Sequence, residues 1–367
     1  MKSFSKNCVM LFLVLILGSG AKTFANNNST RVVRDLCGRE VTVPGKVERV
    51  VALGPGALRF VVYLGVTDKI VGIEDMEKRM VSEQCVRPYA QMLDKSFMKL
   101  PVVSAGGPGK LPDFEAVMLA NPDIVIVSGL DSAQVENIQK KTGVPAVYIT
   151  YGEIGVWGKE AQTSLKLLGN ILGKSDRANR LVNYVESAER ELQKRTKNVE
   201  GKPSVYFGGI SFKGSHGLTS TQAGYAPGAT VNALNVADTL KKAGQSIVDQ
   251  EQIMVWNPDV IFIDWSSKLI VQRDFQKGPQ FYCSLKAVQS ERVYSLLPYN
   301  HYNTNIELAL LNAYFIGKTL YPESFKDVNI SEKADDIYQT FLGIDAPDEV
   351  PAYHSIHFPQ KGDKIKW

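Results

Sequence analysis

Two segments of the chain, 113–123 and 249–259, are near copies of each other. Each contains an aspartate, a glutamate two residues later, an apolar stretch and the triplet Asn-Pro-Asp, and each runs into a second apolar stretch, 124–127 or 260–263. This pattern predicts a short amphipathic helix that ends at Asn-Pro and leads into a buried parallel strand. One recurrence at a large separation indicates a duplicated α/β unit, because a solenoid would need several copies at a short period. We therefore expect two similar lobes, each presenting one outward glutamate.

The segments around these copies alternate between predicted strands and predicted helices. In the first half, strands are predicted at 40–43, 49–53, 70–73, 124–127 and 146–149, with helices at 58–64, around Glu115 and at 132–141. In the second half, strands are predicted at 204–207, 260–263 and 292–296, with helices at 228–235, around Glu251 and at 305–320. Alternating strands and helices indicate parallel sheets covered by helices, and a chain of this length exceeds what one core normally organises. The predicted fold is α/β, with two Rossmann-like lobes.

The segment between the halves has a different pattern. It predicts one helix at 157–171, closed by Gly173, and a second helix from 176 to about 197, with Ser175 as its N-cap. At 1.5 Å per residue, the second helix would be about 33 Å long. We therefore expect an N-terminal lobe at 26–156, a rigid helical link at 157–198, a C-terminal lobe at 199–345, and an extension at 346–367 to which the sequence gives no role. Lobes fixed to a long helix should move little on ligand binding.

The first 25 residues have the pattern of a secretory signal peptide. Lys2 and Lys6 precede an uncharged run at 9–17, and Thr23-Phe24-Ala25 suits a signal peptidase. The run is shorter than the roughly 20 residues of a membrane-spanning helix. Cys8 precedes the run, where it cannot serve as a lipid-attachment site. We expect a cleaved signal and an exported, soluble periplasmic protein that is not a lipoprotein.

Charge and cysteine content narrow the function further. Removing residues 1–25 takes three lysines from the 42 basic residues, which leaves 39 against 38 acidic residues. A nearly neutral chain without basic runs gives no reason to expect a nucleic-acid partner. Cys37, Cys85 and Cys283 remain, so one thiol must stay unpaired, and Cys85 with Cys283 is one candidate pair. Neither the CxxC nor the HExxH spacing occurs, and no structural zinc site is expected.

Several motifs in a fixed order resemble one family. The start, 35–44 followed by 47–53, is similar to the opening of the helical-backbone (class III) periplasmic binding proteins, the substrate-binding components of ABC importers for iron-siderophores, haem and cobalamin. Leu64-Gly65-Val66 with 69–72, both repeated blocks, the Leu168-Gly169 to Lys174 segment and Tyr321-Pro322-Glu323 also fit. The resemblance covers roughly residues 32–343.

The resemblance implies a partner and a role for the two repeated glutamates. In the family, one glutamate on each lobe docks with arginines of the permease dimer in the inner membrane, and Glu115 and Glu251 occupy the matching positions. Two separated charges would set orientation as well as attraction. The alternative is that both are ordinary glutamates in the first turn of a helix, where the helix dipole stabilises a carboxylate by about 0.3–1 kcal/mol.

The ligand site is expected in the loops that follow the strands, because parallel α/β sheets bind ligands beyond the carboxyl ends of their strands. The candidate ligand-binding residues are Gly56, Arg79, Arg87, Tyr89, Tyr151, His216, Tyr225, Trp265, Tyr299, His301 and Tyr302. Aromatic and cationic side chains suit a bulky, partly apolar, anionic complex. For some candidates a plainer interpretation stays open: Gly56 as part of a turn, His216 as a solvated histidine, and Tyr89 or Trp265 as packing residues.

The sequence thus predicts a monomeric solute receptor without catalytic residues, cofactor or confidently assigned metal ligands of its own. Its cargo is expected to be an iron(III) chelate of the siderophore type, bound between the lobes and delivered to the permease. The alternatives are molybdate or tungstate, haem, or a corrinoid on the same fold. A periplasmic α/β enzyme is a further alternative, although no nucleophile elbow or acid–base constellation can be assembled from the sequence.

Overall fold

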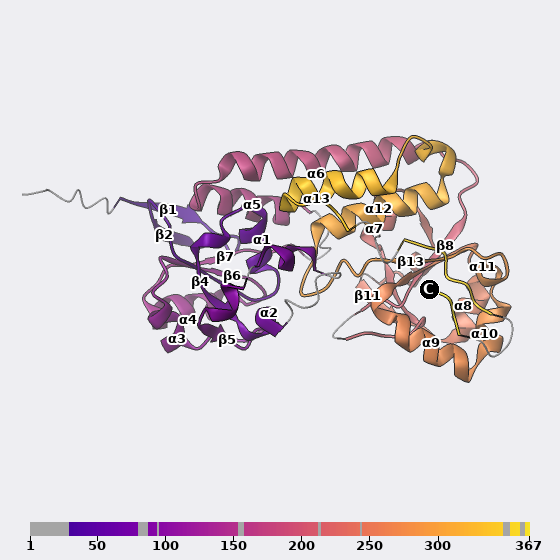
Figure 1. Cartoon of the computed structure of the whole chain (residues 1–367), viewed down its shortest axis with the longest axis horizontal. Coiled ribbons are helices and arrows are strands. Elements are labelled where there is room, and N and C mark those ends of the chain that lie inside the picture. Colours follow the sequence, from indigo (N-terminus) through magenta and orange to yellow (C-terminus); the bar gives the residue numbers. More distant parts are fainter. Residues whose placement is uncertain are drawn as a thin grey trace, which may run out of the picture.

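The computed structural model describes residues 29–79, 87–93, 95–152, 158–211, 214–242, 244–347, 353–359 and 364–367. It consists of two lobes, each built around a sheet, and a group of helices that runs along one side of both (Figure 1). The predicted signal peptide, Cys85 and Trp157 lie outside these residues. In the part of the chain that the structure covers, no helix is both long and apolar enough to cross a membrane.

The first lobe contains a parallel sheet with the strand order β5–β4–β3–β6–β7. The strands are β3 (Val50–Leu53), β4 (Ile70–Glu74), β5 (Val102–Ser104), β6 (Ile124–Val127) and β7 (Ala146–Tyr148). Helices α1 (Ala57–Tyr63) and α2 (Asp75–Arg79) follow β3 and β4, and α3 (Phe114–Ala120) and α4 (Ser132–Thr142) flank β6. An antiparallel pair, β1 (Thr30–Arg34) and β2 (Glu40–Pro44), lies beside them. The strands of this sheet therefore confirm the predicted parallel arrangement.

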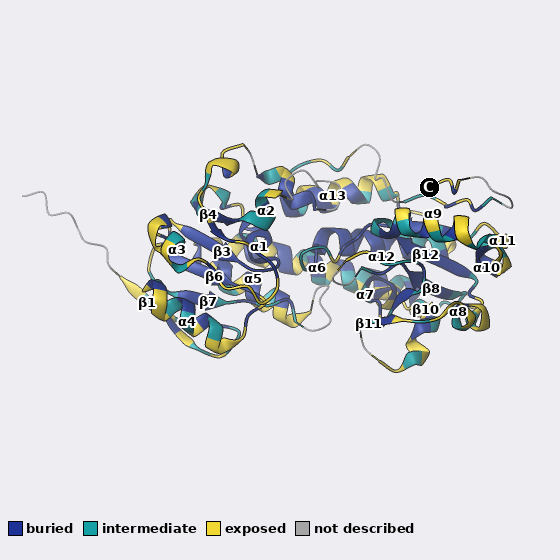
Figure 2. Ribbon diagram, turned by 90° about the horizontal axis from the view of Figure 1, so that it is seen from below, coloured by how far each residue is buried: buried dark blue, intermediate teal, exposed yellow. Residues whose placement is uncertain are grey.

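Alternate residues of the central strands pack in two different cores. Val51 and Val125 contact α3 and α4 on one face, whereas Val50 and Ile124 belong to the core that includes α1 and α5 (Lys159–Ile171). Both faces of β3 and β6 are buried, which explains why these strands read as continuous apolar runs. Figure 2 shows the buried strands enclosed by helices whose outer surfaces are exposed.

The second lobe has a mixed sheet in the order β11–β9–β8–β12–β13, with the short β10 paired to β8. Strands β8 (Ser204–Gly208), β12 (Val260–Asp264) and β13 (Val293–Leu296) are parallel to one another. Strand β9 (Ser220–Ala223) is antiparallel to both of its neighbours, β8 and β11 (Gly244–Ile247). The helices are α7 (Ala226–Thr230), α8 (Gln250–Trp256), α9 (Lys268–Lys277), α10 (Pro279–Ser284) and α11 (Lys286–Gln289).

One predicted helix of this lobe was wrong in part. The helix expected at 228–235 ends at Thr230, and residues 234–235 form β10. Asn232 has a φ of 53°, in the left-handed region, and this conformation breaks the helix before the expected end. The two antiparallel strands were also missed, because their residues are polar and do not form an apolar run.

The two repeated segments fold in the same way. Asp113 caps α3 by accepting hydrogen bonds from the amides of Glu115 and Ala116, and Asp249 caps α8 through the amide of Gln252. Both helices end at an asparagine in the left-handed conformation, followed by proline. The duplicated unit predicted from the sequence is confirmed in both lobes.

The connection between the lobes is more extensive than one helix. Helix α6 (Ser175–Thr196) runs along both lobes, and α12 (Ile306–Leu320) and α13 (Ile330–Leu342) lie beside it (Figure 1). Helix α13 returns from the second half of the chain to contact α1 of the first lobe, and the rings of Tyr63 and Phe341 are 5.0 Å apart. The predicted long helix is therefore present as α6, and α12 and α13 add to the link that it forms. Short 3-10 helices occur at Thr67–Lys69, Pro88–Met92, Phe97–Lys99, Val236–Leu240, Trp265–Ser267 and Pro322–Phe325.

The C-terminal extension packs on the second lobe. The amide of Ile356 donates to the Val293 carbonyl at 2.7 Å, and the amide of Ser295 donates to the His354 carbonyl at 3.1 Å, next to β13 at the edge of the sheet. The side chains of Ile356 and Phe358 are buried against α9 and α10. The extension therefore covers a sheet edge that would otherwise expose unpaired backbone groups.

Candidate ligand site between the lobes

The lobes meet where the strands β3 and β4 end and where the loop after β13 begins. Two side chains of this loop, which covers residues 297–305, reach the first lobe. Asn303 Nδ2 donates to the Pro55 carbonyl at 3.2 Å, and Tyr302 Oη donates to Glu74 Oε2 at 2.6 Å. These contacts lie at the carboxyl ends of strands in both lobes, the region where α/β proteins bind their ligands.

Glu74 is the polar centre of this contact. Its carboxylate also accepts a hydrogen bond of 3.0 Å from the Gly54 amide, and the Gly107 amide donates to Tyr302 Oη at 3.0 Å. Only 2% of Glu74 is exposed. Burial raises the pKa of Glu74 to about 7, although the hydrogen bonds from Tyr302 and the Gly54 amide act in the opposite direction. The carboxyl therefore titrates near neutral pH.

Arg59 of α1 holds the backbone of the same loop. Its side chain is fully buried, and it donates to the carbonyl oxygens of Thr304 at 2.7 Å, His301 at 3.1 Å and Tyr302 at 3.2 Å. Tyr302 and Asn303 have φ angles of 52° and 70°, which non-glycine residues adopt at a cost. The guanidinium thus fixes a strained turn of the second lobe against the first lobe.

A second polar contact joins α1 of the first lobe to α12, through Tyr63 and Glu307. Tyr63 Oη donates to Glu307 Oε2 and accepts a hydrogen bond of 3.2 Å from the Ile306 amide. Both side chains are buried, and burial raises the pKa of each group. The first turn of α12 is thereby attached to the end of α1.

Three candidate residues of the first lobe lie in its interior. Tyr89 donates to Glu77 Oε2 at 2.8 Å, Arg87 lies 3.4 Å from the same oxygen, and the guanidinium of Arg59 stacks 4.7 Å from the ring centroid of Tyr89. Arg87 and Tyr89 have no exposed surface. Tyr151 is also buried and donates to the Gly56 carbonyl at 3.1 Å. In this conformation the three side chains contact residues of the first lobe, namely Glu77, Arg59 and Gly56. Their contact with a ligand stays a prediction.

Gly56 is explained by the same tyrosine. Its φ is 81°, and a Cβ at this position would lie 2.5 Å from the ring of Tyr151. The turn interpretation is therefore sufficient to account for the glycine.

The aromatic candidates of the second lobe are likewise packed inside. Tyr225 stacks on Phe207 with ring centroids 4.3 Å apart, and Tyr299 meets Tyr225 edge-on at 5.5 Å. Both tyrosines are buried beside Asp264, whose pKa burial raises to about 6. Tyr299 of the loop 297–305 thus packs into the aromatic interior of the second lobe.

The remaining candidates retain exposed surface. His301 and Tyr302 are partly exposed at the interlobe contact, and His216 is partly exposed between β8 and β9. Arg79 is exposed and forms an ion pair of 2.9 Å with Asp75. Trp265 lies against the C-terminal extension, with Lys268 Nζ 4.1 Å from its ring and Trp367 at 6.2 Å. Packing against Trp367 gives Trp265 a structural role that the sequence left open.

Sequence reasoning missed three of the residues that join the lobes: Arg59, Tyr63 and Glu307. Glu74 was likewise given no role in the site. One signal was available, because Glu74 ends the apolar run of β4 and thus places a carboxylate at the carboxyl end of a parallel strand. Arg59 gave a weaker signal as the charged residue of an otherwise apolar α1.

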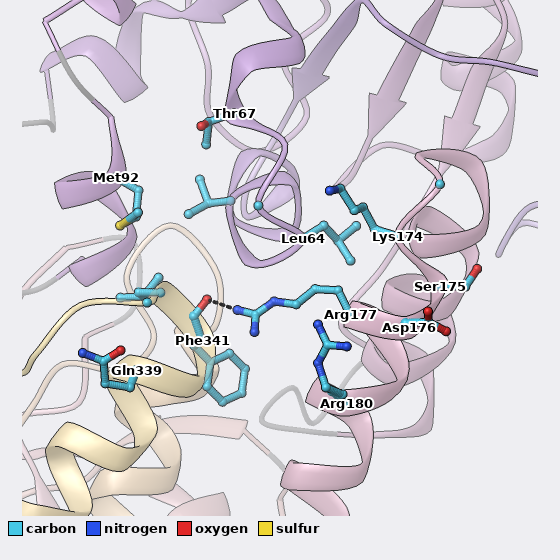
Figure 3. A pocket seen from close by; sticks show the side chains of 15 residues that line it. Leu64, Thr67, Met92, Lys174, Ser175, Asp176, Arg177, Arg180, Gln339 and Phe341 are labelled. Atoms are coloured by element: carbon cyan, nitrogen blue, oxygen red, sulfur yellow. Dashed lines mark hydrogen bonds between the residues drawn. The ribbon is translucent and has the colours of Figure 1, made fainter.

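A separate hollow of about 830 Å³ lies between α1, α6 and α13 (Figure 3). Arg177 projects into it and donates to the carbonyls of Tyr63 and Phe341, each at 3.0 Å. These carbonyls belong to the last residue of α1 and the last turn of α13, whose dipoles favour a cation. Arg177 therefore joins three helices, and we interpret this hollow as part of the link between the lobes.

The predicted docking residues are both accessible. Glu115 and Glu251 lie in the first turns of α3 and α8 and are exposed. Both helices lie on the side of their lobe away from α6 (Figure 1).

The chain matches known proteins over most of its length. The sequence profile described as "Periplasmic binding protein" matches residues 50–299. The molybdate-binding protein MolA of Haemophilus influenzae is 25% identical over 335 residues, covering 85% of this chain and 90% of MolA. Its structure with molybdate bound has a TM-score of 0.66, at 22% identity, and covers 86% of this chain and 99% of MolA.

Two further solved structures share the fold. A periplasmic solute binding protein from Veillonella parvula has a TM-score of 0.72 at 23% identity, covering 87% of this chain and 95% of that protein. Helicobacter pylori CeuE with Ni(II) bound has a TM-score of 0.63 at 20% identity, covering 86% of this chain and 97% of CeuE.

The chain belongs to the periplasmic binding protein family. Its two lobes with parallel strands and linking helices are those of the class III members. It is a non-enzymatic solute-binding component of an ABC importer, which implies a cognate permease.

Proposed function

We propose that this protein carries an iron(III) chelate between its lobes and delivers it to its permease. The observation that carries the proposal is the hydrogen bond between Tyr302 and Glu74, which places a phenol and a carboxyl at the strand ends of opposite lobes. Tyrosine oxygen and the neighbouring His301 are groups that ferric iron accepts as ligands or as outer contacts. Exposed Arg79, which follows β4 on α2, supplies a cation for the anionic shell of a chelate.

A second candidate cargo is a metal oxyanion such as molybdate. Support comes from the 25% identity to a protein named as molybdate-binding. The amides of Gly54 and Gly107 lie at the interlobe contact, where backbone N–H groups suit an oxyanion. Against this candidate, the Glu74 carboxylate already accepts the Gly54 hydrogen bond and would repel a dianion when ionised.

Calorimetric titration of the mature protein separates these candidates. Tryptophan fluorescence is a poor readout, because Trp265 packs against Trp367 of the extension. The titrants are ferric siderophores, haem, cobalamin, molybdate and tungstate, with iron-free chelators as controls. Saturable sub-micromolar binding of one ferric chelate, weakened by Tyr302→Phe, is the expected result. Binding of molybdate alone would replace the cargo, and a lack of binding to every titrant would overturn the proposal.

We also propose that Glu115 and Glu251 dock the receptor to the permease. Their matched positions on two lobes support a partner that presents the same cationic surface twice. The double variant Glu115→Ala with Glu251→Ala should lose import and keep its affinity for the cargo. Glu160→Ala, an exposed first-turn glutamate of α5, is the control and should import normally. A loss of cargo affinity in the double variant would contradict the docking role.

A further inference from the structure

The two lobes repeat more than a glutamate. Eleven large hydrophobic side chains are exposed in the part of the chain that the structure describes. Four of them fall at matching positions of the two repeated segments, and two more fall at matching positions just before these segments. Relative to the capping aspartates, Asp113 and Asp249, these positions are two residues before, five residues after and six residues after. The pairs are Leu111 with Ile247, Met118 with Met254, and Leu119 with Val255.

These side chains are accessible to solvent, and two of them are almost fully exposed. Leu119 is 87% exposed and Val255 is 79% exposed, and Met118 and Met254 are 44% and 47% exposed. Isolated apolar side chains on a surface need no explanation, but a cluster that recurs in a second place does. Burial within this protein does not account for the cluster, since Met118 and Leu119 of α3 and Met254 and Val255 of α8 are exposed, as are Leu111 and Ile247, which precede these helices.

The glutamate shares the helix face of the apolar side chains. In α3, Glu115, Met118 and Leu119 are spaced i, i+3 and i+4, so they line one side of the helix. In α8, Glu251, Met254 and Val255 have the same spacing. Each lobe therefore presents one carboxylate bordered by methionine and an aliphatic side chain.

We infer that these two surfaces form apolar contacts with the permease around each docking glutamate. The inference rests on the proposed docking of Glu115 and Glu251. A partner that fits the same surface on two lobes must present its own complementary surface twice, as a two-fold symmetric dimer does. Excluding water around a charge pair strengthens it, and methionine adapts to the two slightly different lobes. The proposed partner is thus a dimeric membrane protein that presents, at each of two sites, a cation surrounded by apolar side chains.

Site-specific photo-crosslinking in cells of the source organism tests the occupant. A benzophenone amino acid is placed at Leu119 or at Val255 of the full-length protein, and at Val32 as a control. Val32 is 62% exposed, lies in β1 and belongs to neither repeated segment. Both test positions should crosslink to the same ABC permease subunit, identified by mass spectrometry, and Val32 should not. Crosslinks to a second copy of this chain, to different proteins from the two lobes, or equally from Val32 would overturn the inference.

A binding measurement tests how much the exposed apolar side chains contribute to the affinity for the permease. Cargo-free mature protein is titrated onto right-side-out membrane vesicles from the same cells and onto liposomes made from their extracted lipids. Leu119→Ser with Val255→Ser should weaken binding to the vesicles at least tenfold, because burial of an aliphatic side chain changes an equilibrium by about that factor. Val32→Ser should bind as the unmodified protein does. Equal binding to vesicles and protein-free liposomes would show a lipid surface as the occupant and overturn the inference.

The outcomes separate this inference from the docking proposal. If Glu115→Ala with Glu251→Ala abolishes vesicle binding while Leu119→Ser with Val255→Ser leaves it unchanged, the charges dock the protein and the apolar contacts do not. If neither double variant changes the binding of a protein that does bind, both proposals fail.

Discussion

Tyr302 Oη and Glu74 Oε2, separated by 228 residues in the sequence, lie 2.6 Å apart and join the two lobes. The phenol remains partly exposed and the carboxyl is buried. The pair therefore joins the lobes at the place where we propose that the cargo binds.

The first prediction concerns pH. Glu74 has a folded-state pKa of about 7 against an ordinary value of 4.5, so the folded protein binds this proton more tightly than the unfolded chain does. The resulting stabilisation is complete below about pH 4.5 and is lost as the pH rises to about 7. Its size is on the order of 3 kcal/mol.

Urea unfolding of the wild type and of Glu74→Gln between pH 4.5 and 8 checks this prediction. The wild type should lose stability relative to Glu74→Gln across that range. The comparison is needed because the pKa of Asp264 is also raised, to about 6. The titration of Asp264 changes the stability of both proteins equally, so the difference between them isolates Glu74. Parallel pH profiles for the two proteins would show that Glu74 is not the group concerned.

The second prediction concerns Arg59. Arg59→Met should destabilise the protein by about 3–5 kcal/mol, because the carbonyls of His301, Tyr302 and Thr304 lose a buried charged donor. Amide hydrogen exchange should increase in residues 297–305 before it increases in the strands. Arg79→Met is the control, since Arg79 is exposed and surface changes stay within about 0.5 kcal/mol. Unchanged exchange in the loop would contradict the role given to Arg59.

The third prediction concerns the C-terminal extension. Removing the residues after Pro347 should lower the unfolding free energy by roughly 3 kcal/mol or more, since Ile356, Phe358 and Ile365 each lose burial. The variant should also aggregate, because β13 becomes an open sheet edge. Thermal unfolding and light scattering measure the two effects. A truncated protein as stable as the full chain would show that the extension only rests on the surface.

The fourth prediction concerns domain motion. Helices α6, α12 and α13 form a bundle whose members contact elements of both lobes. Because such a bundle resists bending, ligand binding should leave the radius of gyration nearly unchanged. Small-angle X-ray scattering with and without the cargo identified by calorimetry is the measurement. Compaction of the clamshell kind would require the bundle to bend and would contradict the rigid link.

Local signals made much of the fold predictable. The aspartate caps, the Asn-Pro ends and the apolar runs of β6 and β12 act within a few residues, so their pattern in the sequence was sufficient. The two accessible glutamates agree with the same local pattern, which predicted a short helix with one outward glutamate in each lobe.

The candidate site was predictable only as a region. The loops after the strands were identified, and His301 and Tyr302 do lie where the lobes meet. Whether a tyrosine in such a loop faces solvent or the interior was not readable. Tyr89, Tyr151 and Tyr225 turned inward, because an aromatic ring is stabilised by burial whenever its hydroxyl has a partner or its ring can stack.

The sequence by itself determined that the chain folds as two duplicated α/β lobes, each with one accessible glutamate. Only the tertiary structure decided which side chains join the lobes beyond the predicted helical link. Arg59 and the Thr304 carbonyl are 245 residues apart, and Tyr63 and Glu307 are 244 residues apart. Such contacts leave no periodic pattern in the sequence, because a buried polar group finds its partner through the packing of whole elements and not through its neighbours along the chain.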